Sequence, residues 1–221
     1  MKGLFKMTEL LFVRHGYSEG NKGHQFSGQK DFPLDEAGRR QALELADYLR
    51  RAYRIDAIYA SDLSRAIDTV RPIADALSLP VQLMQALREV DVGLWEGVLR
   101  EEVARQYPES YAIYLNTPGL VQFDGGESFA DLRERALAAV QEIVSMNEGK
   151  TVVIATHGGV IRALRTLWEG IPLAQMGRIP HVPNASVTAV RYEGDTATLI
   201  AAGICDYLTE KITEKLPQTS Q

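Results

Sequence analysis

The stretch Leu10-Leu11-Phe12-Val13-Arg14-His15-Gly16 decides the fold. Its apolar part is a run of the kind that buried strands of parallel sheets carry. The run ends abruptly in a cation, an imidazole and a glycine. Ligands of open α/β sheets bind at the carboxyl ends of the strands, so such an ending is typical of an anion site. The stretch therefore predicts the active-site edge of an α/β enzyme.

A second apolar run ends in the same way. Thr151–Thr156 reads as a central strand, and His157-Gly158-Gly159 follows it, with a helix predicted to about residue 168. Two histidines at the carboxyl ends of separate parallel strands can meet at one site. The glycine after each histidine leaves room for close approach of a ligand. Arg65, after a further predicted strand, is expected to join His15 and His157 there.

The rest of the chain alternates between strand and helix patterns. Asp35 is the expected N-cap of a helix over about 36–51, and Ser128 begins a capping box before an amphipathic helix over 129–144. A helix that begins at about residue 61 contains Pro72, which is expected to kink or split it. Further strands are predicted at 55–60 and 79–83, with a hairpin at 186–192 and 196–202. This order predicts an α/β fold with a mainly parallel central sheet and an antiparallel hairpin at one edge.

Length and turn signals predict one domain over residues 1–206. Within it, 17–34 reads as a long glycine-rich loop. Residues 98–124 are the least regular part and are expected to form a variable substrate cap that starts with a short helix. Residues 207–221 are polar and are expected to form a C-terminal tail.

Composition narrows the function classes. The formal net charge of −5 argues against nucleic-acid binding, although clustered arginines can still attract a small phosphorylated substrate. No stretch approaches the length of a membrane span, and the first residues do not read as a signal peptide, so a cytoplasmic protein is expected. Cys205 is the single cysteine, which excludes an intrachain disulfide and a cysteine metal site. It is expected to be a small buried hydrophobe.

Five motifs in order resemble those of the histidine phosphatase superfamily, in its phosphoglycerate mutase-like branch. The resemblance spans residues 10 to about 190 and implies a three-layer α/β/α fold with phosphoryl-transfer activity. The motifs are Arg14-His15-Gly16 with Asn21; Ser61–Ala66 with Thr69; Leu87-Arg88-Glu89 with Gly93, Glu96 and Gly97; Gly125–Ser128; and Thr156–Gly159.

The residues of these motifs suit phosphoryl transfer, which depends on positioning and on neutralising the equatorial oxygens. Arg14 and Arg65 offer planar donor forks that lysine cannot match. His157 and Asn21 add further donors, and Gly158 is a candidate phosphate contact. With this set of donors, no metal or other cofactor is expected.

His15 in its neutral form is the expected nucleophile, giving a phosphohistidine that water hydrolyses. The resemblance implies that the backbone at Gly16 holds the other ring nitrogen. Glu89 is the candidate general acid and base, with Asp91 and Glu96 as rival carboxylates. Arginines nearby favour the ionised form of Glu89, so we expect an arriving phosphate to cancel their field and restore the proton.

Several residues are assigned less directly. Ser27 and Gly28 are expected to contact phosphate or substrate, with a plain turn as the alternative for Ser27. His24 and His181 match no motif and are interpreted as loop histidines. Aromatic and apolar residues of the cap could line the outer pocket or pack beneath its helices, and both readings stay open. These residues are Tyr107, Tyr111, Tyr114 and Val121.

The choice of activity rests on the cap. Residues 97–125 are modest in length compared with the insertion of the resembling mutases. Phe26-Ser27-Gly28 echoes the mutase pattern Phe-Thr-Gly, but Gln29 stands where a tryptophan is expected. The sequence therefore predicts a metal-independent phosphomonoesterase for small phosphorylated metabolites. A phosphoglycerate mutase and a non-catalytic phosphate-binding module are the alternatives, and a homodimer is left open.

Overall fold

The structure, a computed structural model, describes residues 6–210 and is built on one six-stranded sheet. The strand order is β3-β2-β4-β1-β5-β6. The opening strand β1 (Thr8–Arg14) lies between β4 (Thr151–Thr156) and β5 (Val187–Glu193). Arg14 pairs with Thr156 in register, so His15 and His157 leave the sheet side by side.

The remaining strands confirm the predicted fold class. β2 (Ala57–Ala60) pairs in parallel with β4 and with the short edge strand β3 (Val81–Leu83). At the other edge, β5 and β6 (Thr196–Ile204) form the predicted antiparallel hairpin. The starts of β2 and β3 are each two residues later than expected, β5 is shifted by one residue, and β6 ends two residues later than predicted.

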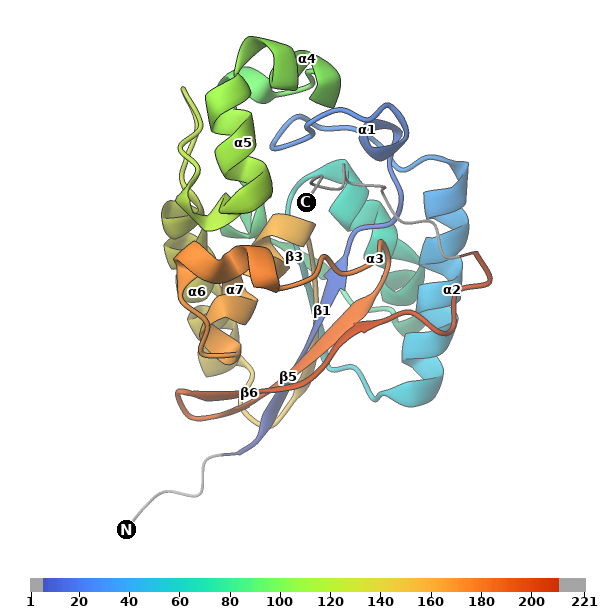
Figure 1. Cartoon of the computed structure of the whole chain (residues 1–221). Coiled ribbons are helices and arrows are strands. Elements are labelled where there is room, and N and C mark those ends of the chain that lie inside the picture. Colours follow the sequence, from blue (N-terminus) through green and yellow to red (C-terminus); the bar gives the residue numbers. More distant parts are fainter. Residues whose placement is uncertain (1–5, 211–221) are drawn as a thin grey trace.

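Helices cover both faces of the sheet, as Figure 1 shows. The helices α2 (Glu36–Ala52) and α3 (Ser64–Leu77) lie on one face, and α6 (Phe129–Met146) and α7 (Gly158–Trp168) lie on the other. The two faces follow from the strand period of two, which sends successive side chains to opposite sides. In β1, Leu10 and Phe12 join the core beneath α6 and α7, whereas Leu11 and Val13 join the core beneath α2 and α3.

The helix ends obey the predicted capping chemistry. The Asp35 side chain accepts a hydrogen bond from Gly38 N at 2.8 Å, and Ser128 and Asp131 form a capping box. Of the two outcomes expected at Pro72, a split of the helix is wrong, because α3 is continuous through this residue, and a kink stays a prediction. Pro72 removes one backbone donor. The buried face with Val70 and Ile73 keeps the helix on the sheet despite that loss.

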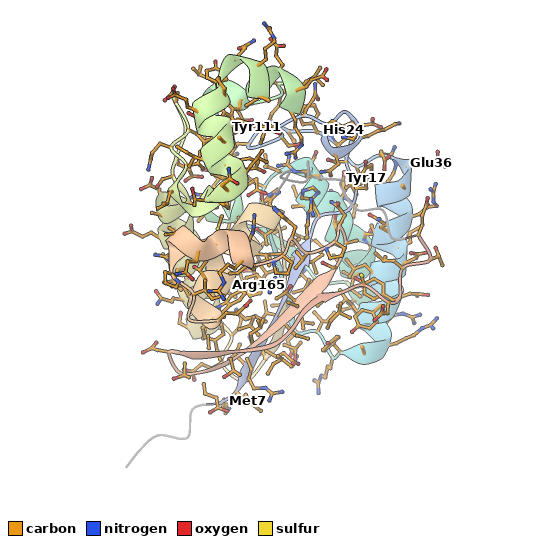
Figure 2. The ribbon with its side chains drawn as sticks, viewed as in Figure 1. Met7, Tyr17, His24, Glu36, Tyr111 and Arg165 are labelled. Carbon is orange, nitrogen blue, oxygen red and sulfur yellow. The ribbon has the colours of Figure 1, made fainter. Side chains whose placement is uncertain are left out.

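A cap lies over the carboxyl ends of the strands. It consists of α4 (Arg100–Gln106) and α5 (Pro108–Asn116), beside the short helix α1 (Glu19–Lys22) in the loop after β1. Figure 2 shows Tyr111 on α5 and His24 after α1 at this end of the molecule, with Met7 at the opposite end. The part of the chain that the structure describes also contains four 3₁₀ helices: η1 (Gln85–Leu87), η2 (Gly93–Trp95), η3 (Pro118–Leu120) and η4 (Leu173–Arg178).

The residues after β6 return to α2. Tyr207 stacks on Tyr48 with ring centroids 4.3 Å apart, and Leu208 is buried. Of the predicted tail, residues 211–221 lie outside the described residues. The expectation for Cys205 is wrong, since its side chain is only half-buried. No helix within residues 6–210 has the length and apolar character needed to cross a membrane.

Candidate active site

A pocket of about 90 Å³ opens at the carboxyl ends of β1 and β4, beneath the cap. The structure brings the predicted residues together here from distant parts of the chain. His15 follows β1, Arg65 comes from α3 and Gly158 begins α7. His157 is fully buried behind the pocket, with its ring centroid 5.2 Å from that of His15. The other predicted residues that line the pocket are Arg14, Asn21, Ser27, Gly28 and Glu89.

The ring of His15 is fixed by its own loop. Its Nδ1 lies 2.8 Å from the carbonyl oxygen of Gly16, so Nδ1 carries a proton and donates it. Burial, followed by the charges of Arg65 and Arg14, holds the pKa of His15 well below its ordinary value. The imidazole is therefore neutral, and its lone pair is on Nε2, the nitrogen not used in this contact.

The two arginines are held by backbone carbonyls. Arg14 Nη1 donates to Val182 O at 2.7 Å. Arg65 is completely buried and donates to Gly28 O at 2.6 Å and to Lys30 O at 2.9 Å. Burial lowers the pKa of Arg65 to about 10, so the guanidinium stays charged at neutral pH. Within residues 6–210, Arg65 Nε has no hydrogen-bond partner, and a phosphoryl oxygen would supply one.

His157 is neutral for the same reasons as His15. Burial, followed by the charge of Arg65, holds its pKa well below the ordinary value. Its Nε2 lies 2.9 Å from Ser61 Oγ, while Nδ1 is buried without a partner among the described residues. A serine hydroxyl that donates to Nε2 is consistent with a ring proton on Nδ1, where a phosphoryl oxygen could accept it.

Glu89 is the carboxylate that faces the pocket. Its Oε2 accepts from Gly159 N at 3.0 Å, and its Oε1 accepts from Val90 N at 2.9 Å. A Cβ on Gly159 would lie 2.2 Å from Glu89 Oε1. A side chain at position 159 would push the Glu89 carboxylate away from the first turn of α7.

The two rival carboxylates have other partners. Asp91 accepts from Gly93 N at 2.9 Å in its own turn. Glu96 accepts from Gln29 N at 2.7 Å and from Lys30 N at 2.6 Å, and burial raises its pKa. Neither lines the pocket. Glu96 instead fastens the loop whose carbonyls hold Arg65.

The contact between Glu96 and the 28–30 loop requires a glycine at position 28. Its φ of +46° and a distance of 2.1 Å between a built Cβ and Glu96 Oε1 both exclude a side chain. The hydroxyl of Ser27 lies close to Gly20, where a Cβ would come within 2.4 Å of Ser27 Oγ. Ser27 and Gly28 thus line the pocket as parts of a tightly packed loop.

Asn21 lines the pocket and also caps the start of α1. Its Oδ1 accepts from Ser18 N at 3.1 Å and from Ser18 Oγ at 2.9 Å, which completes a capping box. Asn184 Nδ2 lies 3.4 Å from the same oxygen and donates to His15 O at 3.0 Å. Asn184 therefore ties the loop before β5 to the loop that contains His15.

Sequence reasoning missed the support for Glu89. Arg135 of α6 donates to Glu127 Oε2 at 2.9 Å, to Ala86 O at 2.7 Å and to Glu89 O at 2.9 Å. Glu127 in turn accepts from Asp91 N at 3.0 Å. The Gly125–Ser128 motif pointed to Glu127, but nothing in the local pattern marks Arg135 as its partner.

The outer wall of the pocket comes from the cap and from α7. Tyr114, Arg100, Arg162 and His181 line it. His181 lies in the loop between η4 and β5, as its interpretation as a loop histidine implied, and this loop borders the pocket. Because His181 belongs to none of the five motifs, the sequence did not predict that it lines the pocket. Of the aromatic cap residues, Tyr114 lines the pocket. The other candidates are buried or partly buried in the core: Tyr107, Tyr111 and Val121.

Within residues 6–210, no group of three or more histidine, cysteine, aspartate and glutamate side chains is placed to hold a metal ion.

The chain resembles known phosphatases in both fold and sequence, and it is a phosphatase enzyme. The model of the histidine phosphatase superfamily (branch 1) matches residues 10–204, and the chain belongs to this superfamily.

Three similar proteins illustrate the range. Phosphoserine phosphatase 1 of Hydrogenobacter thermophilus is 33% identical over 92% of this chain and 96% of its own. Phosphoglycerate mutase-like protein 4 of Arabidopsis thaliana is 34% identical over 92% of this chain and 88% of its own. The solved structure of Bacillus stearothermophilus YhfR has a TM-score of 0.87 and 34% identity, and covers 90% of this chain and 98% of its own.

Proposed function

We propose that the protein is a metal-independent phosphomonoesterase that hydrolyses small phosphorylated metabolites through a phosphohistidine on His15. The observation that carries the proposal is the state of this ring. His15 is neutral, its Nδ1 is engaged by Gly16 O at 2.8 Å, and two buried arginines lie beside it. A fixed neutral imidazole next to an anion site is equipped for nucleophilic attack on phosphorus.

In the first half-reaction, the lone pair of His15 Nε2 attacks phosphorus and the ester P–O bond breaks. The equatorial oxygens accept hydrogen bonds from the guanidinium groups of Arg14 and Arg65 and from the ring of His157. The amide groups at the start of α7, beginning at Gly158, add the positive end of a helix dipole. Two guanidinium charges balance the phosphoryl dianion, which supports catalysis without a metal.

Glu89 acts as the general acid in this step and gives its proton to the departing alkoxide. The negative phosphoryl group offsets the positive charge of Arg65, which interacts with Glu89. In the second half-reaction, the Glu89 carboxylate takes a proton from water, whose oxygen attacks the phosphorus. The P–N bond then breaks, inorganic phosphate leaves and neutral His15 is restored.

The test is hydrolysis of p-nitrophenyl phosphate in excess EDTA. Wild-type protein is expected to release p-nitrophenol, and His15→Ala to lose activity by roughly 10⁴-fold or more. His24→Asn, in the loop after α1, is the control and keeps full activity. Rapid quenching with a labelled substrate is expected to trap an acid-labile, base-stable phosphoryl-enzyme. Activity that survives His15→Ala, or that disappears in EDTA, would contradict the proposal.

A phosphoglycerate mutase is the second candidate, because a relative with 34% identity is named mutase-like. A mutase must keep water away from its phosphohistidine, whereas a phosphatase admits it. Incubation with 3-phosphoglycerate, with and without 2,3-bisphosphoglycerate, separates the two. We expect inorganic phosphate as the product under both conditions; 2-phosphoglycerate as the main product would favour the mutase.

A further inference from the structure

The pocket holds more cationic groups than a phosphoryl group needs. Arg14 and Arg65 lie at its inner end, and Arg100 and Arg162 lie in its outer wall. Among the described residues that line the pocket, only Glu89 carries a carboxylate. In the proposed function, the two inner arginines suffice for the phosphoryl dianion. Arg162 of the outer wall is therefore a candidate to bind a second part of the substrate.

Arg162 is the best-defined of the outer cations. Its Nε donates to Ile179 O at 2.7 Å, its Nη2 to Gly177 O at 3.2 Å, and its Nη1 lies 2.8 Å from His181 Nε2. These contacts use three of the five N–H donors of a guanidinium, which leaves one on each Nη nitrogen. Arg162 has no ion pair with any carboxylate of residues 6–210. One turn further along α7, Arg165 pairs with Glu169 at 2.6 Å.

His181 leaves the charge of Arg162 uncompensated. An arginine can only donate, so His181 Nε2 must accept and the ring must be neutral. Enclosure of the ring, followed by the charges of Arg162, Arg14 and Arg100, holds the pKa of His181 well below its ordinary value, although its outer side is exposed. The wall thus presents a partly buried guanidinium oriented by neutral partners, an arrangement that favours an anionic ligand.

We infer that Arg162 binds a carboxylate on the alcohol side of the scissile ester, so that the preferred substrates are small phosphorylated carboxylic acids. The inference rests on the proposed function and names its substrate class. One N–H on each Nη nitrogen forms the planar pair of donors that a carboxylate accepts. Arg162 and the phosphate candidate Gly158 both belong to α7 and line the same pocket, so one small molecule can reach both. The pocket volume of about 90 Å³ agrees with a short carbon chain.

The test compares two substrates that differ only in the carboxylate, 3-phosphoglycerate and glycerol 3-phosphate. Wild-type kcat/KM is expected to favour 3-phosphoglycerate, and Arg162→Met to reduce that ratio by about 10- to 100-fold. Arg162→Lys keeps the charge without the planar fork and should fall between them. His181→Glu places a carboxylate beside Arg162 and should also reduce the ratio.

Arg178→Met is the matched control, because it removes one exposed arginine near the end of η4 and leaves the pocket intact. It should keep the wild-type ratio. A ratio that Arg162→Met and His181→Glu leave unchanged would overturn the inference. So would a larger Arg162-dependent gain for 1,3-propanediol bisphosphate, which would assign the position to a second phosphate.

Binding separates a failure of the inference from a failure of the proposed function. If wild-type protein turns over glycerol 3-phosphate and depends on His15, but shows no preference for the carboxylate, only the inference fails. If it turns over no ester, the proposed function fails. Calorimetric titration of His15→Ala protein with the same two compounds then tests the carboxylate position directly. A tighter Kd for 3-phosphoglycerate that His15→Ala/Arg162→Met loses would support it, and equal Kd values would overturn it.

Discussion

The inner and outer halves of the pocket are built in different ways. At the inner end, three groups are held by backbone carbonyls: His15 by Gly16 O, Arg14 by Val182 O and Arg65 by two carbonyls of one loop. The cap in the outer half rests on aromatic packing around Trp95, whose ring centroid lies 4.9 Å from that of Phe26. Backbone carbonyls hold these inner groups and also Arg162 in the outer wall, whereas side-chain packing holds the cap.

This difference predicts that inner substitutions affect all substrates and outer substitutions only some. The largest effect is expected for Arg65→Lys, which removes the fork but keeps the charge. We expect kcat/KM to fall by about 10²- to 10³-fold for every phosphate ester. Arg71→Lys, an exposed position on the same helix, is the control. A loss of activity on only one substrate would contradict the prediction that inner substitutions affect all substrates.

Glu89→Gln should act through the leaving group. An alkyl phosphate needs a proton on its departing oxygen, whereas p-nitrophenolate leaves without one. We expect kcat to fall by about 10²-fold or more for glycerol 3-phosphate and far less for p-nitrophenyl phosphate. Steady-state kinetics on the two esters checks this, and equal losses would reject Glu89 as the general acid.

Glu127→Gln should give a weaker form of the same signature. The substitution breaks the ion pair with Arg135, which holds the backbone on both sides of Glu89. A small misplacement of Glu89 should lower kcat on alkyl phosphates by about tenfold. Glu134→Gln, an exposed neighbour of Arg135 on α6, is the matched control. A loss that is the same for p-nitrophenyl phosphate would indicate a general structural defect.

Tyr114→Ala tests the outer half. Tyr114 contacts Phe26 at a centroid distance of 5.2 Å and lines the pocket. We expect KM for p-nitrophenyl phosphate to rise by about two- to tenfold with little change in kcat. Ile113→Ala, on the exposed side of α5, is the control. A fall in kcat similar to that of Arg65→Lys would show that the two halves are not separable.

The smallest effect concerns pH. Protonation of His15 would remove the nucleophilic lone pair, and the lowered pKa moves that protonation to more acidic conditions than the ordinary value of 6.5. The kcat/KM for the ester dianion should therefore stay within about twofold from pH 7.5 to pH 6. A fall in kcat/KM centred near pH 6.5 would show that burial does not lower the pKa of His15.

The sequence predicted those features that local chemistry determines. Strand runs, helix caps and the histidines at strand ends follow from nearest neighbours along the chain, so the architecture and the inner half of the site were accessible. The continuity of α3 through Pro72 was not, because packing on the sheet outweighs the loss of one backbone donor. The roles of Arg135, Arg162 and His181 depend on contacts across long separations with no periodic signal.

One contact has a consequence for synthesis of the chain. Asn184 Nδ2 donates to the carbonyl oxygen of His15, and Ala185 N donates to that of Arg14 at 2.9 Å. The first of these contacts joins residues 169 positions apart. A ribosome must therefore release almost the whole chain before the loop around His15 acquires its native support. The nascent protein therefore carries His15 through most of translation without the contacts that residues 184 and 185 make to this loop.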